Sequence, residues 1–188
     1  GAIICPYELC IAAVGNAMDN GAELKTSFEV KKIERKGDVY EISSDNETIT
    51  SKYIVNSAGL FSDKVAELAG KKTFEVHPRK GEYMLLDREC GGHIKSTVFR
   101  CPSKMGKGVL VTPTVDGNLL VGPSAEDIDD KSDLSTTAAG LAKVRSLASE
   151  QVSGIDYSKT ITSFTGLRAT GSTGDFVIGM PRPGFINL

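Results

Sequence analysis

The spacing of apolar residues predicts two helices and several short strands over residues 6–70. Between positions 6 and 20, one helix face is formed at i, i+3, i+4 and i+7 spacing by Cys10, Ala13, Val14 and Ala17. Pro6 suits the first turn of that helix, and Gly21 suits its end. Short alternations then predict strands over 22–25, 29–34, 38–42 and 53–55. A second helix is expected over 62–69, with its inward face at Val65, Leu68 and Ala69.

From residue 76 onward the pattern favours antiparallel strands. The runs that predict strands are 82–86, 97–99, 109–114, 118–121, 160–168 and 176–178. Asp116-Gly117 stands between two of these runs, and Asp-Gly is a strong hairpin signal. A helix is expected over 136–151, where one face is formed by Leu141, Val144, Leu147 and Ala148. Polar residues predict a loop at 127–135, and two prolines and a glycine predict a turn at 181–184.

This order of elements indicates an α+β fold, in which a block of antiparallel strands is inserted into an α/β portion. The first residues, GAIICPYELC, contain no Met and read like the middle of a protein. The apolar end, Phe185-Ile186-Asn187-Leu188, is typical of a truncation. We therefore expect the chain to be part of a larger protein.

Composition and charge narrow the class of function. With 40% hydrophobic and 24% charged residues and a net charge of −2, the chain is expected to be globular and to bind neither nucleic acid nor an anionic membrane surface. It shows no signal peptide and no apolar run long enough to span a bilayer. Its cysteines, Cys5, Cys10, Cys90 and Cys101, lack clear zinc-site spacing. We therefore expect reduced thiols, no metal and a cytoplasmic location.

The segment Tyr53–Gly70, YIVNSAGLFSDKVAELAG, carries the strongest chemical signal. A short apolar strand ends in small residues, which let a ligand approach the backbone, and a helix start follows. Free N–H groups at a helix start suit an anion such as pyrophosphate. The Gly-x-Gly-x-x-Gly motif that opens a dinucleotide-binding domain is absent from the chain, which favours an internal piece of a flavoenzyme with an incomplete FAD-binding domain.

Four stretches resemble a known family in the same order: IVNSAGLFSDKVAELAG, HPRKGEY, GLRAT and DFVIG. They are similar to FAD-dependent oxidoreductases of the D-amino-acid oxidase superfamily, in the branch of glycerol-3-phosphate dehydrogenase and 2-hydroxyglutarate oxidase. The resemblance implies a partial FAD-binding domain over 1–75, an antiparallel substrate domain over 76–170 and a return segment over 171–188.

The resemblance also implies positions for the cofactor FAD. Val30 would meet the adenine through its backbone, or it is an ordinary strand valine. Ser57, Ala58 and Gly59 would face the pyrophosphate or ribose of FAD; the alternative for Gly59 is an ordinary turn glycine, which its neighbours Asn56 and Ser62 disfavour.

For the substrate, Arg168 is the main candidate. Its planar guanidinium can hold a carboxylate or phosphate with two parallel hydrogen bonds, and Gly166 permits close approach. The family has an arginine for the substrate anion at a similar place, and the alternative is a salt bridge. Tyr83 is a second candidate, or a half-buried strand tyrosine. Arg79 and Lys80 form a basic pair that either attracts an anion or is solvated.

The chain contains two histidines, His77 and His93, and neither is assigned as the catalytic base. The function implied for the whole protein is oxidation of glycerol 3-phosphate, a small anionic substrate, by hydride transfer to FAD. The alternatives are a 2-hydroxyglutarate oxidase or dehydrogenase, an amino-acid oxidase, and a non-catalytic binding domain. The isolated chain is expected to be inactive, and the electron acceptor stays open.

Overall fold

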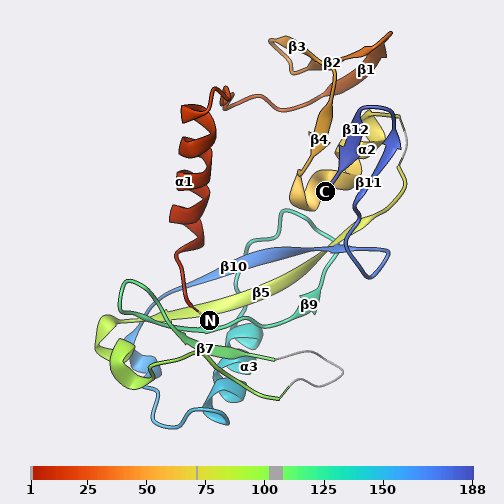
Figure 1. The fold of residues 1–188 in the computed structure, drawn as a ribbon. Coiled ribbons are helices and arrows are strands. Elements are labelled where there is room, and N and C mark those ends of the chain that lie inside the picture. Colours follow the sequence, from red (N-terminus) through yellow and green to blue (C-terminus); the bar gives the residue numbers. More distant parts are fainter. Residues whose placement is uncertain (1, 71, 102–107) are drawn as a thin grey trace. The chain divides into compact units, whose positions relative to one another are not determined.

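The computed structural model describes residues 2–70, 72–101 and 108–188 (Figure 1). The chain forms two compact units. Unit 1 consists of Gly1–Glu23 and Arg79–Leu167, and unit 2 consists of Leu24–Pro78 and Arg168–Leu188. The predicted division into 1–75, 76–170 and 171–188 concerns the domains of the whole protein and stays a prediction. The observed units differ from it most clearly in Gly1–Glu23, which groups with the antiparallel strands.

Unit 1 is built on a six-stranded sheet with the order β10-β5-β8-β7-β6, in which β9 also pairs with β5 (Figure 1). The strands are β5 (Val76–Leu86), β6 (Val98–Phe99), β7 (Leu110–Pro113), β8 (Leu119–Gly122), β9 (Glu126–Asp127) and β10 (Thr160–Gly171). The helices are α1 (Pro6–Asp19), α3 (Ala138–Ser149) and the 3-10 turns η2 (Arg88–His93) and η3 (Tyr157–Lys159). The ends of β5 and β10 extend into unit 2.

The predicted hairpin and the predicted face of α3 are both confirmed in unit 1. Strands β7 and β8 pair antiparallel, and Gly117 occupies the turn between them with φ of +85°. Val144 and Ala148 of α3 are fully buried and pack in one cluster with Leu119 and Val121 of β8. The burial of this apolar face against the sheet is the main favourable term that holds the helix in place.

Unit 2 contains two small sheets. Strands β1 (Lys32–Lys36), β2 (Val39–Ser43) and β3 (Thr48–Ser51) form an antiparallel sheet. Strands β11 (Gly179–Arg182), β12 (Phe185–Asn187) and β4 (Ile54–Asn56) form the other, in which β12 and β4 are parallel. Between β4 and β5 lie η1 (Gly59–Phe61) and α2 (Ser62–Leu68). The core includes Tyr40 and Phe185, and the Tyr40 hydroxyl donates to the Pro183 carbonyl at 2.8 Å.

The antiparallel sheets and the sheet with a parallel strand pair agree with the predicted α+β class. Several of the predicted elements, however, were wrong. Residues 22–25 form no strand, β1 begins at Lys32 rather than at 29, and β3 was missed. Residues 176–178 form no strand either: they have no regular structure, and the Phe176 N–H donates to the Asp175 carboxylate. The apolar end of the chain is instead the strand β12.

The predicted inward faces of two helices also need correction. No residue of α1 is buried, so the stripe that begins at Cys10 does not pack into the core of the described structure. In α2 and at its C-cap, Ala66 and Ala69 are buried and Val65 packs against the same core cluster, but Leu68 is exposed. Such errors arise because helix periodicity identifies a face but not the partner that covers it.

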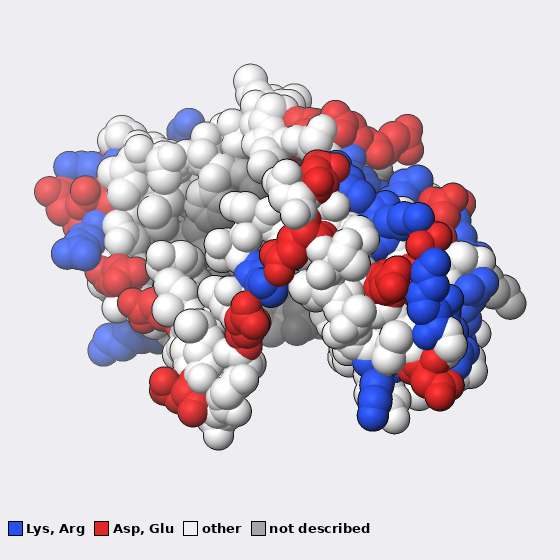
Figure 2. Space-filling view, turned by 90° about the horizontal axis from the view of Figure 1, so that it is seen from above, with Lys and Arg blue, Asp and Glu red and all other residues white. Residues whose placement is uncertain are grey.

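No helix among the described residues is long and apolar enough to cross a membrane. Acidic and basic side chains are interspersed over the face drawn in Figure 2.

Candidate functional site

In unit 2, the parallel strands β4 and β12 end side by side. Asn56 is the last residue of β4, and it lies opposite Asn187, the last residue of β12. The carboxyl ends of parallel strands are the usual place for ligands in open α/β sheets. The segment Ser57-Ala58-Gly59 follows at this edge, and all three residues are exposed.

A buried amide network holds this segment in shape. Asn56 is only 2% exposed, and its Nδ2 donates to the Ser62 carbonyl at 2.8 Å and to Asn187 Oδ1 at 2.9 Å. Asn56 Oδ1 in turn accepts from the Ala58 N–H at 3.3 Å. One side chain therefore ties together the strand end, the loop and the first residue of α2. Buried polar groups with satisfied hydrogen bonds give a single, well-defined backbone path.

Gly59 has a backbone conformation that other residues adopt only with strain. Its φ is +56°, and a Cβ added to it would meet no atom within 4 Å. The space beside this backbone is therefore open, as the approach of a ligand requires. The structure thus places Ser57, Ala58 and Gly59 together at an exposed strand end, and their contact with FAD stays a prediction.

The start of α2 is less available to an anion than the sequence suggested. Asp63, in the first turn, is buried. Its carboxylate accepts from the Lys64 N–H at 2.9 Å and from the Val76 N–H at 3.2 Å. A negative side chain already occupies this end of the helix, and the open backbone near Gly59 is the better ligand site.

Val30 lies two residues before β1 rather than at a strand start. Its side chain is half-buried and packs against the core of unit 2. The neighbouring Lys31 N–H donates to the Ser43 carbonyl at 2.8 Å, which holds this stretch against β2. The predicted backbone contact with adenine stays a prediction.

Tyr83 lies in β5 within unit 1 and stacks on Phe164 of β10. The ring centroids are 5.0 Å apart, and the planes differ by 11°. Phe164 was not a candidate from the sequence, and it is 43% exposed despite its large apolar ring. The sequence feature that could have identified Phe164 is its position two residues before Gly166 in the predicted strand.

Arg168 lies in the part of β10 that belongs to unit 2, and its side chain is exposed. Its guanidinium has no hydrogen bond and no ion pair with another residue that the structure describes. The alternative of a salt bridge within the described chain therefore receives no support. A free guanidinium can accept a phosphate or carboxylate in its fork, and the assignment to substrate stays a prediction.

Arg79 and Lys80 of the basic pair are both paired with aspartates, and Arg79 is exposed whereas Lys80 is buried. Arg79 holds both oxygens of Asp127, with Nε–Oδ1 at 2.7 Å and Nη2–Oδ2 at 3.0 Å. The Lys80 side chain is 4% exposed and donates to Asp133 Oδ2 at 2.8 Å and to Ser135 Oγ at 3.2 Å. These two residues fasten the polar loop over 127–135 to β5.

The same loop provides a pH-dependent contribution to stability. Hydrogen bonds from the Lys80 ammonium and from the Ser135 hydroxyl and N–H lower the pKa of Asp133 from 3.8 to about 2. A depressed pKa means that the ionised carboxylate stabilises the folded state at pH values above 3.8. This contribution is lost as the pH falls from 3.8 toward about 2.

We expect Asp133→Asn to destabilise unit 1 at pH 6, because the amide cannot form the ion pair with Lys80. The difference from wild type should shrink below the ordinary pKa of 3.8, where the wild-type carboxylate takes up its proton. Urea unfolding at a series of pH values, followed by circular dichroism, measures this difference. Asp129→Asn, an exposed aspartate of the same loop, is the control. A difference that stays constant with pH would contradict the proposed ionic role of Asp133.

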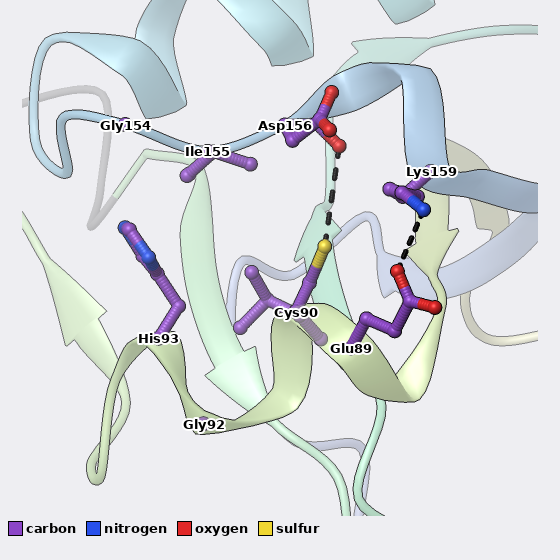
Figure 3. A pocket seen from close by; sticks show the side chains of 9 residues that line it. Glu89, Cys90, Gly92, His93, Gly154, Ile155, Asp156 and Lys159 are labelled. Atoms are coloured by element: carbon purple, nitrogen blue, oxygen red, sulfur yellow. Dashed lines mark hydrogen bonds and ion pairs between the residues drawn. The ribbon is translucent and has the colours of Figure 1, made fainter.

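The printed contacts of the two histidines include none of the predicted flavin or substrate residues. His77 Nε2 lies 3.8 Å from Glu75 Oε2, and His93 Nε2 lies 2.8 Å from the Ser153 carbonyl. His93 instead lines a cavity of about 390 Å³ between η2 and the loop that leads into η3, together with Cys90 (Figure 3). None of the predicted site residues lines this cavity.

The Cys90 thiol that lines this cavity is expected to be unreactive. Burial, followed by the negative charges of Asp156 and Asp87, raises the pKa of the Cys90 thiol, which disfavours the reactive thiolate. All four cysteines are free. The described residues include no group of three or more His, Cys, Asp or Glu side chains that could hold a metal ion.

Known proteins are similar to this chain in sequence and in fold. A model of the FAD dependent oxidoreductase family, DAO, matches residues 1–188. Glycerol 3-phosphate dehydrogenase of Caloramator mitchellensis is 45% identical over 190 residues, which cover 100% of this chain and 40% of that protein. Mitochondrial L-2-hydroxyglutarate dehydrogenase of Mus musculus is 30% identical over 146 residues, which cover 66% of this chain and 32% of that protein.

Among solved structures, dithionite-reduced L-alpha-glycerophosphate oxidase of Mycoplasma pneumoniae with FAD bound superposes with a TM-score of 0.80 at 31% identity. The match covers 90% of this chain and 46% of that one. The chain therefore spans less than half the length of these three relatives. The resemblance drawn from the strand-and-helix segment around Asn56–Gly59 is confirmed, and the chain belongs to the FAD dependent oxidoreductase family.

Proposed function

We propose that the protein containing this chain oxidises glycerol 3-phosphate with FAD as its cofactor. The observation that carries this proposal is the exposed Arg168, which has no partner among the described residues and can hold a phosphate. The relatives named for glycerol 3-phosphate and glycerophosphate support the same substrate.

The residues of unit 2 fit the cofactor. Ser57, Ala58 and Gly59 are exposed at the ends of the parallel strands, and the space beside Gly59 is open. These are the properties that a backbone contact with pyrophosphate or ribose requires. FAD, when bound, supplies the redox chemistry by accepting a hydride. Val30 would meet the adenine through its backbone.

For the substrate, the chain provides orientation rather than redox chemistry. Arg168 would hold the phosphate in its two-pronged fork. Tyr83 is the second proposed substrate residue, as a hydrogen-bond partner. In the reaction, the carbon that bears the hydroxyl loses a hydride, the hydroxyl loses a proton to a base, and a ketone results. Neither histidine of this chain is proposed as that base.

L-2-hydroxyglutarate is the second candidate substrate, because a relative named for it covers 66% of the chain. An amino acid is the third, since its carboxylate would suit the same arginine. A non-catalytic binding domain is the remaining alternative. The cytoplasmic location and the domain roles of 1–75, 76–170 and 171–188 are part of the proposal, and the electron acceptor is left open.

The direct test uses the complete protein purified with its flavin. Under anaerobic conditions, glycerol 3-phosphate should bleach the flavin absorbance faster than L-2-hydroxyglutarate, glycine or sarcosine at equal concentration. Bleaching by an amino acid alone would replace the proposed substrate with an amino acid. A complete protein that contains no flavin, or whose flavin no compound of the panel reduces, would favour the binding-domain alternative.

A further inference from the structure

Asn187 carries a buried amide whose nitrogen is unpaired among the described residues. It is the last residue of β12, and only 2% of its surface is exposed. Its Oδ1 accepts from Asn56 Nδ2 at 2.9 Å, but its own Nδ2 forms no hydrogen bond with a residue that the structure describes. Buried polar groups are normally hydrogen-bonded, because an unpaired donor keeps the cost of leaving water. Asn187 Nδ2 is therefore available to an acceptor on a bound molecule.

The hydrogen bonds around Asn187 determine which end of its amide is free. Asn56 Nδ2 donates to the Ser62 carbonyl at 2.8 Å, and Asn56 Oδ1 accepts from the Ala58 N–H at 3.3 Å. A carbonyl can only accept and a backbone N–H can only donate, so the Asn56 amide has one allowed orientation. Its nitrogen faces Asn187 and requires an oxygen there. The free group of Asn187 is therefore the NH2 donor.

Asn187 Nδ2 lies at the edge of unit 2 where β4 and β12 end and where β11 begins (Figure 1). Among the described side chains, the fully enclosed polar atom without a partner is Gln151 Oε1, so Asn187 Nδ2 is not sealed off. On the side of β12 away from Asn56, Asn187 lies opposite Gly179. A Cβ added to Gly179 would meet no atom within 4 Å, as at Gly59. The same edge thus has open space at both glycines and a free donor at Asn187.

We propose that Asn187 is a further cofactor-binding residue, whose Nδ2 donates a hydrogen bond to a phosphate or sugar oxygen of FAD. This inference rests on the proposed use of FAD and does not depend on which substrate is oxidised. The carboxyl ends of parallel strands are where dinucleotides bind in open α/β sheets, and the phosphates and hydroxyls of FAD offer acceptor oxygens there. Asn56 then joins the two parts of the cofactor site, because its one side chain holds both Ala58 and Asn187.

The competing role of Asn187 is purely structural, with its Oδ1 holding Asn56 and its Nδ2 contributing nothing. Asn187→Asp separates the two roles. A carboxylate oxygen still accepts from Asn56 Nδ2, but the carboxylate has no proton to donate to FAD. Asn46→Asp makes the same chemical change at an exposed position of unit 2 and is the matched control.

The test uses the complete protein after removal of its flavin, and it measures the Kd of added FAD by flavin fluorescence. Circular dichroism of each apoprotein checks that the variant is folded. We expect Asn187→Asp to raise the Kd roughly tenfold or more, because a donor to FAD is lost and a negative charge takes its place. Asn46→Asp should leave the Kd within about twofold of wild type. Competition by ADP locates the contact, since ADP carries the phosphates and the ribose but lacks the ribityl chain.

A folded Asn187→Asp apoprotein that binds FAD within about twofold of wild type would overturn the proposal and leave Asn187 with the structural role. If Asn187→Asp does not fold, a crystal structure of the complete wild-type protein with FAD decides. The distance from Asn187 Nδ2 to an oxygen of FAD should then be about 3.2 Å or less. A protein acceptor at Nδ2 instead would overturn the proposal. Wild-type protein that binds no FAD at all would show that the proposed function itself is wrong.

Discussion

Replacement of Arg168 by alanine is expected to lower kcat/KM for glycerol 3-phosphate by roughly a hundredfold or more in the complete enzyme. Two hydrogen bonds from a guanidinium to a phosphate contribute about 1.5–3 kcal/mol each, and about 1.36 kcal/mol corresponds to a factor of ten in rate. Arg168→Lys keeps the charge but loses the planar fork, so it should lie between wild type and alanine.

Steady-state kinetics measure kcat/KM, and the absorbance ratio of flavin to protein measures the flavin content. Flavin content should be nearly unchanged, because the proposed flavin contacts lie in the segment Ser57-Ala58-Gly59 and at Val30. Arg88→Ala is a matched control, since Arg88 is also exposed and has no partner among the described residues. Wild-type kcat/KM in Arg168→Ala, or flavin loss in proportion to activity, would exclude Arg168 from the substrate site.

Structural features that depend on residues adjacent in the sequence could be predicted. The Asp116-Gly117 turn demands a backbone that favours glycine, and the apolar stripe of α3 has the period of a helix, so both could be predicted. The exposed segment after Asn56 was predictable for the same reason, because small residues at the end of an apolar run mark a strand tip. The resemblance of these stretches to one family then indicated FAD.

Features that depend on distant partners were not predictable. Strand β12 pairs with β4, and its Asn187 lies 131 positions from Asn56 in the sequence. The burial of Lys80 depends on Asp133, 53 positions away, and its charge alone predicts a solvated side chain. Phe176 illustrates the reverse error: its apolar run predicted a strand, but the segment has no regular structure and Phe176 is 88% exposed. The local sequence pattern does not indicate which distant residues will pair or which side chains they will bury.

The charge of Glu82 predicts a solvated side chain, yet the residue is buried, and it carries the second large prediction. The residue is 1% exposed, and its carboxylate accepts from the Thr137 N–H at 3.0 Å and from the Thr137 hydroxyl at 2.9 Å. Thr137 is the N-cap of α3, and its Oγ1 accepts from the Gly140 N–H at 2.9 Å. Glu82 therefore joins β5, beside Tyr83, to the start of α3.

We expect Glu82→Ala to lower the free energy of unfolding of unit 1 by about 3 kcal/mol, because it removes a buried carboxylate that accepts two hydrogen bonds from Thr137. Glu82→Gln keeps one oxygen for the Thr137 N–H and should cost less. Urea unfolding followed by circular dichroism measures the loss, and amide exchange over Ala138–Ser149 locates it. Glu89→Ala, which removes an exposed glutamate paired with Lys159, should change stability by less than about 1 kcal/mol. If Glu82→Ala and Glu89→Ala were equally mild, the buried carboxylate would not be the anchor of α3.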